Sequence, residues 1–221
     1  MDSKIIVTED NSKTLLIPEL NETYHSAKGA LTEALHVFIK EGLEYTGLNE
    51  LNIFEMGMGT GLNALLTLAH SVRHNIKINY TTIEKFPLPF DKVQELDYLN
   101  LLDLKEFEDE FKKMHSSESN TEQQLHPNFI FKRIKQDVNK LSLNKESIDL
   151  IYYDAFGPKV QSELWTEEVM LIMKNILVKN GILITYCAQG AFKRTLKSLN
   201  FDVQGIPGPP GKREITRAIK Q

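Results

Sequence analysis

The chain has 221 residues, of which 41% are hydrophobic and 25% are charged, and its formal net charge is −4. This composition is typical of a globular protein and excludes a wholly disordered or collagen-like chain. No apolar run approaches the roughly 18–20 residues that span a bilayer, and the acidic N-terminus lacks the long apolar segment of a secretory signal. The single cysteine, Cys187, excludes an intramolecular disulfide, so we expect a reducing, cytoplasmic location.

Charge is distributed unevenly along the chain. Residues 179–221 contain eight Lys or Arg residues and two acidic residues, so this end is basic while the rest of the chain is acidic. A basic end on an acidic body is typical of a local phosphate-binding face, although a solvated surface can have the same composition. The net negative charge argues against a general polyanion-binding protein.

The first segments predict a hairpin followed by a helix. Short β-prone runs at residues 4–8 and 13–17 flank four polar residues, which predicts two antiparallel strands. Apolar residues then recur at helical spacing from Ala30 to Tyr45, with Gly42 interrupting the pattern near its end. We assign residues 1–48 to an N-terminal extension packed on the core, which comprises residues 49–221.

Beyond this extension, strand-like and helix-like segments alternate. The predicted strands lie at residues 51–56, 76–84, 129–134, 148–153, 182–186, 201–206 and 215–219. The predicted helices lie at residues 62–72, 90–102, 104–114, 166–177 and 192–199, and residues 115–126 are predicted to form a mobile surface loop. This alternation predicts an α/β, Rossmann-like fold with a mostly parallel, doubly wound sheet. The loop at 207–211 is too short for a crossover helix, so the last strand should run antiparallel to its predecessor.

A glycine turn follows the first core strand, where ligands bind in doubly wound folds. A dinucleotide fingerprint would require glycine at position 62, but this residue is leucine. The spacing of Glu55, Gly57, Gly59 and Gly61 instead resembles motif I of class I S-adenosylmethionine (SAM) methyltransferases. The acidic residue suits a cationic amino-acid moiety, and the glycines allow close approach of a ligand. The alternative is a purely structural tight turn that binds no ligand.

Carboxylates at the next two strand ends strengthen this interpretation. Glu84 ends the predicted strand at 76–84, where an acidic residue can accept hydrogen bonds from ribose hydroxyls. Asp137 follows the strand at 129–134, in the usual position for a carboxylate near an adenine amino group. Either residue alone could be a solvated side chain, but three acidic residues at three successive strand ends favour a nucleotide-like cofactor.

Asp154 follows the apolar strand at 148–153, so its carboxylate should emerge at the same rim as the glycine turn. Amino-methyltransferases often have an acidic or amide side chain here, followed by a proline and an aromatic residue. The polar group holds the amine, and the aromatic residue, here Phe156, packs on the base or ring. The alternative is a capping Asp in a turn before Pro158. We predict that Asp154 is the catalytic residue.

Five segments resemble the methyltransferase part of the MnmC family of tRNA 5-methylaminomethyl-2-thiouridine biosynthesis proteins. These segments are residues 24–38 (YHSAKGALTEALHVF), 55–63 (EMGMGTGLN), 83–88 (IEKFPL), 153–166 (YDAFGPKVQSELWT) and 211–214 (GKRE). The first and fourth are distinctive, because methyltransferases in general lack them. One departure is the order Asp154-Ala155-Phe156-Gly157-Pro158, where the family usually has Asp-Gly-Phe-Ala-Pro, which puts the substrate contacts of this loop in question.

The resemblance implies a specific reaction. The family methylates the 5-aminomethyl group of wobble (2-thio)uridine in tRNA, with SAM as the methyl donor. A flavin-dependent domain follows in bifunctional members; here no second glycine-rich fingerprint is present, so we expect a stand-alone methyltransferase without FAD. The expected cofactor contacts are Tyr24, Glu55, Gly57, Gly59, Gly61, Asn63, Glu84, Asp137 and Phe156.

Recognition of tRNA requires aromatic and basic side chains. Phe86 and Trp165 are candidates for stacking on a splayed base. The phosphate-contact candidates are Lys193, Arg194, Lys197, Lys212 and Arg213. His70 and His74 have a zinc-compatible spacing but no third ligand nearby, so we expect no metal. The alternatives are a SAM methyltransferase for a small-molecule or protein amine, an aminopropyl transferase, and a non-catalytic RNA-binding module.

Overall fold

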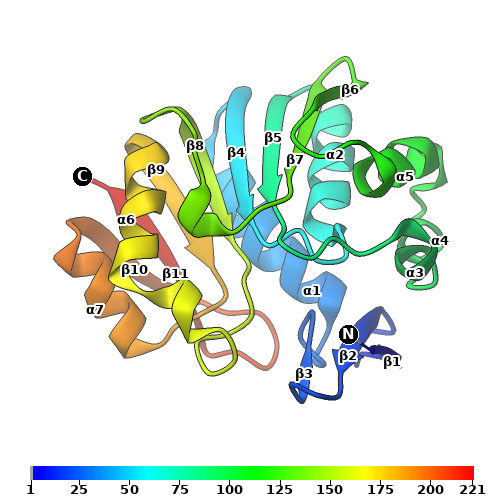
Figure 1. The fold of residues 1–221 in the computed structure, drawn as a ribbon, viewed down its shortest axis with the longest axis horizontal. Coiled ribbons are helices and arrows are strands. Elements are labelled where there is room, and N and C mark those ends of the chain that lie inside the picture. Colours follow the sequence, from blue (N-terminus) through cyan, green and yellow to red (C-terminus); the bar gives the residue numbers. More distant parts are fainter. Residues whose placement is uncertain (1) are drawn as a thin grey trace.

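An eight-stranded mixed sheet forms the centre of the computed structural model, which describes residues 2–221 (Figure 1). The strand order is β10-β11-β9-β8-β4-β5-β7-β6. The strands are β4 (Glu50–Met56), β5 (Lys77–Ile83), β6 (Glu122–His126), β7 (Phe129–Ile134), β8 (Ile148–Tyr153), β9 (Leu177–Thr185), β10 (Phe201–Pro207) and β11 (Glu214–Lys220). The inner strands are parallel, whereas β11 is antiparallel to β9 and β10, as the short loop predicted.

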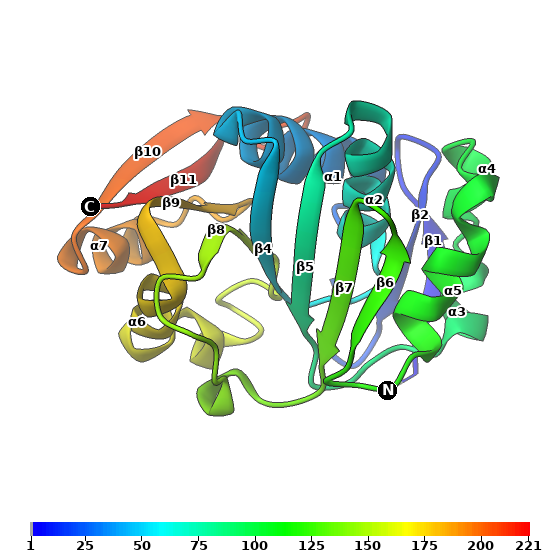
Figure 2. The ribbon, with the colours of Figure 1, turned by 90° about the horizontal axis from the view of Figure 1, so that it is seen from above.

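Helices cover both faces of this sheet (Figure 2). Successive residues of a strand point to opposite faces, and two apolar cores result. Tyr152 of β8 belongs to the core under η1 and α2, whereas Tyr153 belongs to the core under α6 and α7. The helices are η1 (Leu35–Glu44), α2 (Leu62–His74), α6 (Glu167–Ile176) and α7 (Gly190–Ser198). The predicted doubly wound α/β fold is therefore confirmed.

The N-terminal hairpin is also confirmed, with one addition. Strands β1 (Lys4–Val7) and β2 (Lys13–Ile17) pair antiparallel, and the short β3 (Glu22–Thr23) adds to β2. The helix that follows begins as α1 (Ala30–Ala34) and continues as the π-helix η1 (Leu35–Glu44). The assignment of residues 1–48 as a separate extension stays a prediction.

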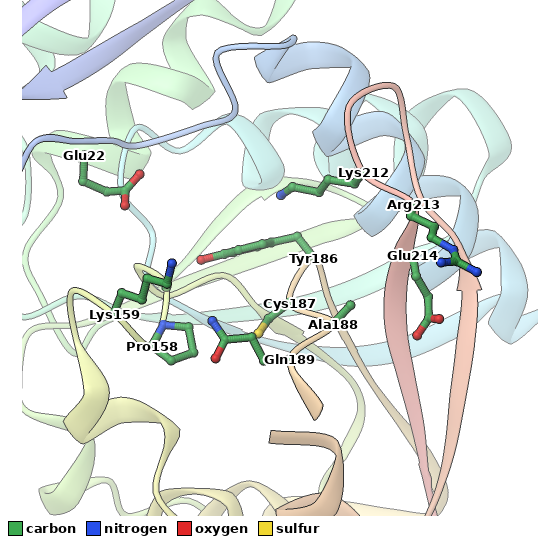
Figure 3. A pocket seen from close by; sticks show the side chains of 11 residues that line it. Glu22, Pro158, Lys159, Tyr186, Cys187, Ala188, Gln189, Lys212, Arg213 and Glu214 are labelled. Atoms are coloured by element: carbon green, nitrogen blue, oxygen red, sulfur yellow. The ribbon is translucent and has the colours of Figure 1, made fainter. Parts of the chain in front are cut away.

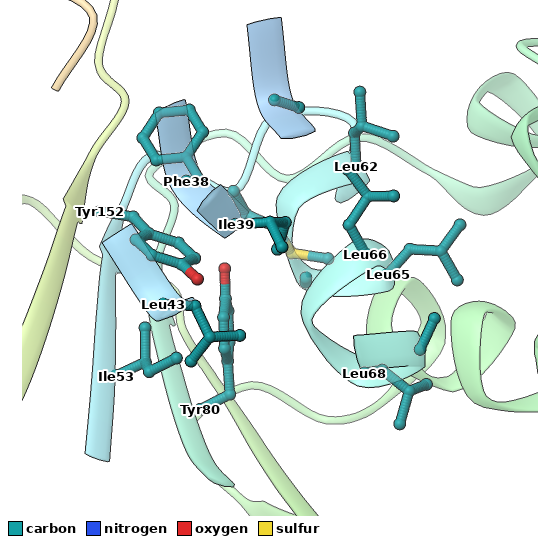
Figure 4. Close-up of a cluster of buried hydrophobic side chains, with 14 of the residues drawn as sticks. Phe38, Ile39, Leu43, Ile53, Leu62, Leu65, Leu66, Leu68, Tyr80 and Tyr152 are labelled. Atoms are coloured by element: carbon teal, nitrogen blue, oxygen red, sulfur yellow. The ribbon is translucent and has the colours of Figure 1, made fainter. Parts of the chain in front are cut away.

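Gly42 lies inside this helix and allows it to approach the sheet closely. A Cβ atom at Gly42 would lie 3.1 Å from Ile184 and 3.3 Å from the Tyr152 ring. In Figure 4, Phe38, Ile39 and Leu43 of η1 meet Tyr152 and the leucines of α2 in one apolar cluster. The glycine that interrupts the pattern in the sequence is therefore a packing residue of the helix.

Residues 90–126 differ from the prediction. The expected helix at 90–102 is broken at Asp97, whose φ is 60°, into α3 (Phe90–Gln94) and α4 (Tyr98–Leu101). The next helix consists of a 3-10 turn, η2 (Lys105–Phe107), followed by α5 (Glu108–Ser116). The expected loop at 115–126 is confirmed only over residues 117–121, because α5 extends to Ser116 and β6 forms an antiparallel edge strand on β7. Strand β6 is polar, and Leu125 is its single buried residue.

Two short 3-10 turns lie at the carboxyl ends of parallel strands. The short 3-10 turns η3 (Val138–Lys140) and η4 (Ser162–Trp165) follow β7 and β8. Strand β9 begins earlier than predicted, at Leu177, and its register on β8 shifts between Ile148 and Leu150. Among the described residues 2–221, no helix is both long and apolar enough to cross a membrane.

Candidate active site

The glycine turn between β4 and α2 needs its glycines for close packing. Gly57, Gly59 and Gly61 have φ values of 88°, 52° and 75°, which favour residues without a Cβ atom. A Cβ atom at Gly57 would lie 3.0 Å from the backbone oxygen of Asp154, and one at Gly59 would lie 3.0 Å from the Tyr24 ring. The turn therefore meets the loop after β8 on one side and the N-terminal segment on another.

Asp154 lies against this turn, as predicted. Its backbone N–H donates to the oxygen of Met56 at 3.0 Å, so the chain after β8 stays parallel to the end of β4. Its carboxylate accepts a hydrogen bond of 2.8 Å from Nδ2 of Asn63, in the first turn of α2. The same Nδ2 also donates to Oε1 of Glu55 at 3.2 Å. One amide therefore bridges two carboxyl groups.

Burial changes the acidity of both carboxyl groups. It raises the pKa of Glu55 to about 8, and the neighbouring charge of Asp154 adds to this rise. It also raises the pKa of Asp154 to about 7, again with a contribution from a carboxylate, that of Glu33, while Asn63 and Lys212 act in the opposite direction. Two adjacent carboxyl groups of this kind do not both carry a full charge at neutral pH. Asp154 is therefore suited to exchange a proton near neutrality.

Glu55 is fully buried, and it meets the rim of the site through Asn63. We predicted a direct contact with a cationic ligand, but in this arrangement the side chain is covered. Within residues 2–221, Oε2 of Glu55 and Oδ1 of Asn63 are buried atoms without a hydrogen-bond partner. The Asn63 oxygen leaves an acceptor next to Asp154 for a donor group of a ligand.

Glu84 joins the glycine turn to the loop after β5. Its carboxylate accepts hydrogen bonds from the backbone N–H groups of Gly59, at 3.2 Å, and Phe86, at 2.8 Å. Asp137 is held further along the rim by Lys85 at 2.9 Å and by the backbone of Asn139 at 3.0 Å, and Lys85 contributes most to lowering its pKa. The carboxylates thus stand at the predicted strand ends, and their ligand contacts stay predictions.

Tyr24 and Phe156 meet across the glycine turn. Their rings pack edge-on with centroids 5.1 Å apart, and burial together with the charge of Glu84 raises the pKa of Tyr24 to about 12. The neighbouring His25 contacts Thr60 of the turn at 3.3 Å. Burial lowers the pKa of His25 to about 4, so this anchoring imidazole is neutral at physiological pH. The N-terminal segment is therefore part of the site.

Trp165 is buried, which contradicts its predicted role as a stacking surface for a base. It is 7% exposed, and its Nε1 donates to the backbone oxygen of Phe156 at 2.8 Å. Its ring packs edge-on against Tyr153 and Phe192. Trp165 thus holds the loop that contains Phe156 by packing in the core beneath it and by donating this hydrogen bond. Phe86, in contrast, is 66% exposed.

A cavity of about 590 Å³ opens at the ends of β8 and β9, where it is lined in part by the loop that follows Asp154 (Figure 3). Tyr186 and Lys212 point into it, with Glu22 and Lys159 on the opposite side (Figure 3). Its lining consists of Glu22, Gly157, Pro158, Lys159, Tyr186, Cys187, Ala188, Gln189, Lys212, Arg213 and Glu214. The sequence analysis missed Glu22, Lys159 and Tyr186, although Lys159 belongs to a family-like segment.

The predicted phosphate contacts fall into two groups. Lys193 and Lys212 form ion pairs with Glu214 and Glu33, so each is already held by a carboxylate. Arg194, Lys197 and Arg213 are exposed. His70 and His74 stack with ring centroids 4.2 Å apart, and residues 2–221 contain no group of three His, Cys, Asp or Glu side chains that could hold a metal ion.

Comparison with known proteins agrees with this geometry. Residues 96–221 match the family model of S-adenosyl-L-methionine-dependent methyltransferases. The chain is 28% identical to the tRNA 5-methylaminomethyl-2-thiouridine biosynthesis bifunctional protein MnmC of Cupriavidus metallidurans, over 94% of this chain and 33% of that protein. It is 27% identical to the MnmC protein of Leptospira interrogans, over 95% of this chain and 34% of that protein. The chain thus spans about one third of the length of these relatives.

Solved structures show the same fold. MNMC2 from Aquifex aeolicus superposes with a TM-score of 0.73 at 23% identity, over 98% of this chain and 70% of that chain. A TehB-like SAM-dependent methyltransferase from Corynebacterium glutamicum has a TM-score of 0.50 at 11% identity, over 86% of this chain and 87% of that chain. The resemblance identified from the sequence segments is therefore confirmed over nearly the whole chain.

Proposed function

Because the chain belongs to the family of S-adenosyl-L-methionine-dependent methyltransferases, we propose that it methylates the 5-aminomethyl group of (2-thio)uridine at the tRNA wobble position. The product would be 5-methylaminomethyl-2-thiouridine. One observation carries the proposal: the Asp154 carboxyl, with a pKa raised to about 7, accepts a hydrogen bond from Asn63 beside the glycine turn, and the loop that follows it lines an open cavity. The similarity of the chain to MnmC proteins, over 94% of its length, supports the choice of the wobble uridine as the methyl acceptor.

The glycine turn and its neighbours suit the cofactor. SAM supplies an electrophilic methyl group on a positively charged sulfur atom. Glu84 and Asp137 at the strand ends and the free acceptor of Asn63 would hold its polar groups, and the turn of Gly57, Gly59 and Gly61 would lie beside it. The Tyr24–Phe156 pair would cover it. We assign Glu55 the task of orienting Asn63, because Glu55 itself is buried.

Asp154 has a clear task in amine methylation. An alkyl ammonium has no lone pair, and with a pKa of about 10 it predominates at neutral pH. The Asp154 carboxylate can accept a hydrogen bond from the acceptor nitrogen, orient its lone pair and take a proton. Orientation of the reacting atoms can supply about 7–11 kcal/mol of barrier reduction. The reaction consumes SAM and tRNA, so its chemistry calls for neither a flavin nor a metal.

The tRNA would approach over the cavity and α7. The wobble base lies in a single-stranded loop, so its displacement costs less than base flipping from a duplex. Phe86 offers an exposed ring for stacking, while Arg194, Lys197 and Arg213 offer exposed cations for phosphates. We expect this reaction in the cytoplasm.

A direct assay tests this function. The purified chain is incubated with SAM that carries a deuterated methyl group and with tRNA that carries 5-aminomethyl-2-thiouridine, and the nucleosides are analysed by mass spectrometry. We expect label in 5-methylaminomethyl-2-thiouridine. A matched tRNA with unmodified wobble uridine should stay unlabelled. Absence of label in the aminomethyl tRNA, while a small-molecule or protein amine is methylated, would overturn the proposed acceptor.

A further inference from the structure

Lys212 is held inside the cavity by a tight turn between β10 and β11. The backbone N–H of Lys212 donates to the oxygen of Pro209 at 2.9 Å, and that of Gly208 donates to the oxygen of Arg213 at 3.3 Å. A Cβ atom at Gly208 would lie 2.5 Å from the backbone oxygen of Lys212, so this turn requires glycine there. The turn directs Lys212 inward, whereas Arg213 points away from Tyr186 (Figure 3).

The ammonium group of Lys212 is fixed by two contacts. It forms an ion pair with Glu33, a residue of α1 that is 9% exposed, and its Nζ lies 4.0 Å from the centroid of the Tyr186 ring. The Tyr186 hydroxyl donates to the backbone oxygen of Ala155 at 2.7 Å, next to Asp154. The cation is therefore tied to the loop that carries Asp154, and it is not a free phosphate contact.

We propose that Lys212, held in place by Glu33, is a positioning residue of the acceptor pocket whose positive charge keeps the acceptor amine in its neutral, nucleophilic form. This inference rests on the proposed function. A second cation next to a partly buried ammonium is unfavourable, so the incoming R–NH3+ would lose a proton more easily. That proton passes to the Asp154 carboxylate, which leaves R–NH2 with its lone pair and Asp154 neutral.

The charges around Asp154 determine in which direction each substitution should shift its protonation. Glu55 of β4, Glu33 of α1, Lys212, and the Tyr80 and Tyr186 hydroxyls face this region from the surrounding elements. The cavity adds Glu22, Lys159, Cys187, Arg213 and Glu214. Glu33 raises the pKa of Asp154, and Lys212 lowers it. Loss of Lys212 should therefore hinder deprotonation of both the acceptor and Asp154, while loss of the Glu33 charge should favour it.

The pH profile of methyl transfer in a single turnover tests the proposal. We expect Lys212→Met to move the acid limb to higher pH by roughly one unit, which is about a tenfold loss of rate at a fixed pH on that limb. Glu33→Gln should move it to lower pH, and Lys212→Arg should keep the wild-type profile. Lys179→Met, which removes an exposed lysine of β9, is the matched control and should change nothing.

A second measurement does not depend on catalysis. The titration of the Asp154 carboxyl can be followed by 13C NMR in the protein alone, with Asp154→Asn to assign the signal. We expect a higher midpoint in Lys212→Met and a lower midpoint in Glu33→Gln. Unmoved midpoints and unmoved acid limbs in both folded variants would overturn the inference. If the wild-type protein methylates no tRNA, the proposed function fails, whereas the titration still decides whether Lys212 controls Asp154.

Discussion

The charged side chains at the two ends of the proposed site differ in their exposure to solvent. Near the glycine turn, the carboxyl groups of the buried Glu55 and the half-buried Asp154 share a single amide donor from Asn63. On α7, at the basic end of the chain, Arg194 and Lys197 are exposed to solvent. Burial shifts the pKa of the first pair into the neutral range. Exposure leaves the second pair screened by salt and available to a polyanion.

This difference in exposure separates the side chains suited to proton transfer from those suited to tRNA binding. A group that exchanges a proton at neutral pH needs a perturbed pKa, and burial beside a like charge provides one. A group that attracts phosphates needs to be reached, and each such contact contributes little by itself. Lys212 lies between these two extremes, because it belongs to the basic end in sequence but its ammonium contacts the Glu33 carboxylate and the Tyr186 ring.

The largest effect is expected at Asp154. Asp154→Ala should lower the rate of methyl transfer by about 10²–10⁴-fold, because the substrate amine loses the carboxylate that accepts its hydrogen bond and its proton. Asp154→Asn keeps the shape but not the basicity, so it should be similarly slow. Single-turnover rates with labelled SAM measure this. Asp202→Asn, at an exposed residue of β10, is the control, and near-normal rates in both Asp154 variants would show that the Asp154 carboxyl is not used.

The next effect concerns stability at the boundary between the two regions. Trp165→Ala should lower the free energy of unfolding by about 3–5 kcal/mol, because it removes a buried ring and the hydrogen bond to Phe156. Phe86→Ala, at an exposed ring, should change it by about 0.5 kcal/mol or less. Urea denaturation measures both. Equal losses in the two variants would mean that burial does not distinguish these aromatic residues.

The pH dependence of stability tests the buried carboxyl pair. The pKa of Glu55 is raised from 4.5 to about 8 in the folded protein, so folded Glu55 keeps a proton that the unfolded chain loses. The stabilising contribution of protonated Glu55 is therefore fully present below pH 4.5 and is lost as the pH rises toward 8. Glu55→Gln stays neutral, so its stability relative to wild type should increase across this window.

Thermal or urea unfolding at several pH values measures this difference. The matched control is Glu50→Gln, which removes an exposed carboxyl at the start of the same strand. A Glu55→Gln curve parallel to that of the wild type would show that Glu55 is ionised inside the fold.

The smallest effects belong to the exposed cations. Arg194→Ala should weaken tRNA binding a few-fold and reduce the slope of log affinity against log salt by about 1. Lys197→Ala should act similarly. Filter binding at several salt concentrations measures the slope, and Lys179→Ala serves as the control on β9. If both α7 variants keep the wild-type slope, this helix is not part of the tRNA surface.

Much of the fold could be predicted because the core strands are apolar runs. The strands at 129–134 and 148–153 were predicted with the observed bounds. The position of Asp154 followed from its place after a buried strand, since side chains beyond the carboxyl ends of parallel strands gather at one rim. The short 207–211 loop determined the direction of β11.

Other features depend on contacts between distant parts of the chain. Strand β6 is polar because it lies at a sheet edge, so its sequence resembles a loop. An aromatic residue in a motif does not reveal its exposure, and Trp165 is covered by Tyr153 and Phe192 from other elements. Similarly, the inward position of Lys212 depends on Glu33, far away in the sequence. Local patterns contain none of these pairings.

The most direct test of the central claim is the wobble nucleoside composition of tRNA from cells with and without this protein. Mass spectrometry should show that loss of the protein removes 5-methylaminomethyl-2-thiouridine and accumulates the 5-aminomethyl form. Return of the wild-type gene should restore the methylated nucleoside, and Asp154→Asn should not. Unchanged nucleosides in cells that lack the protein would contradict the account.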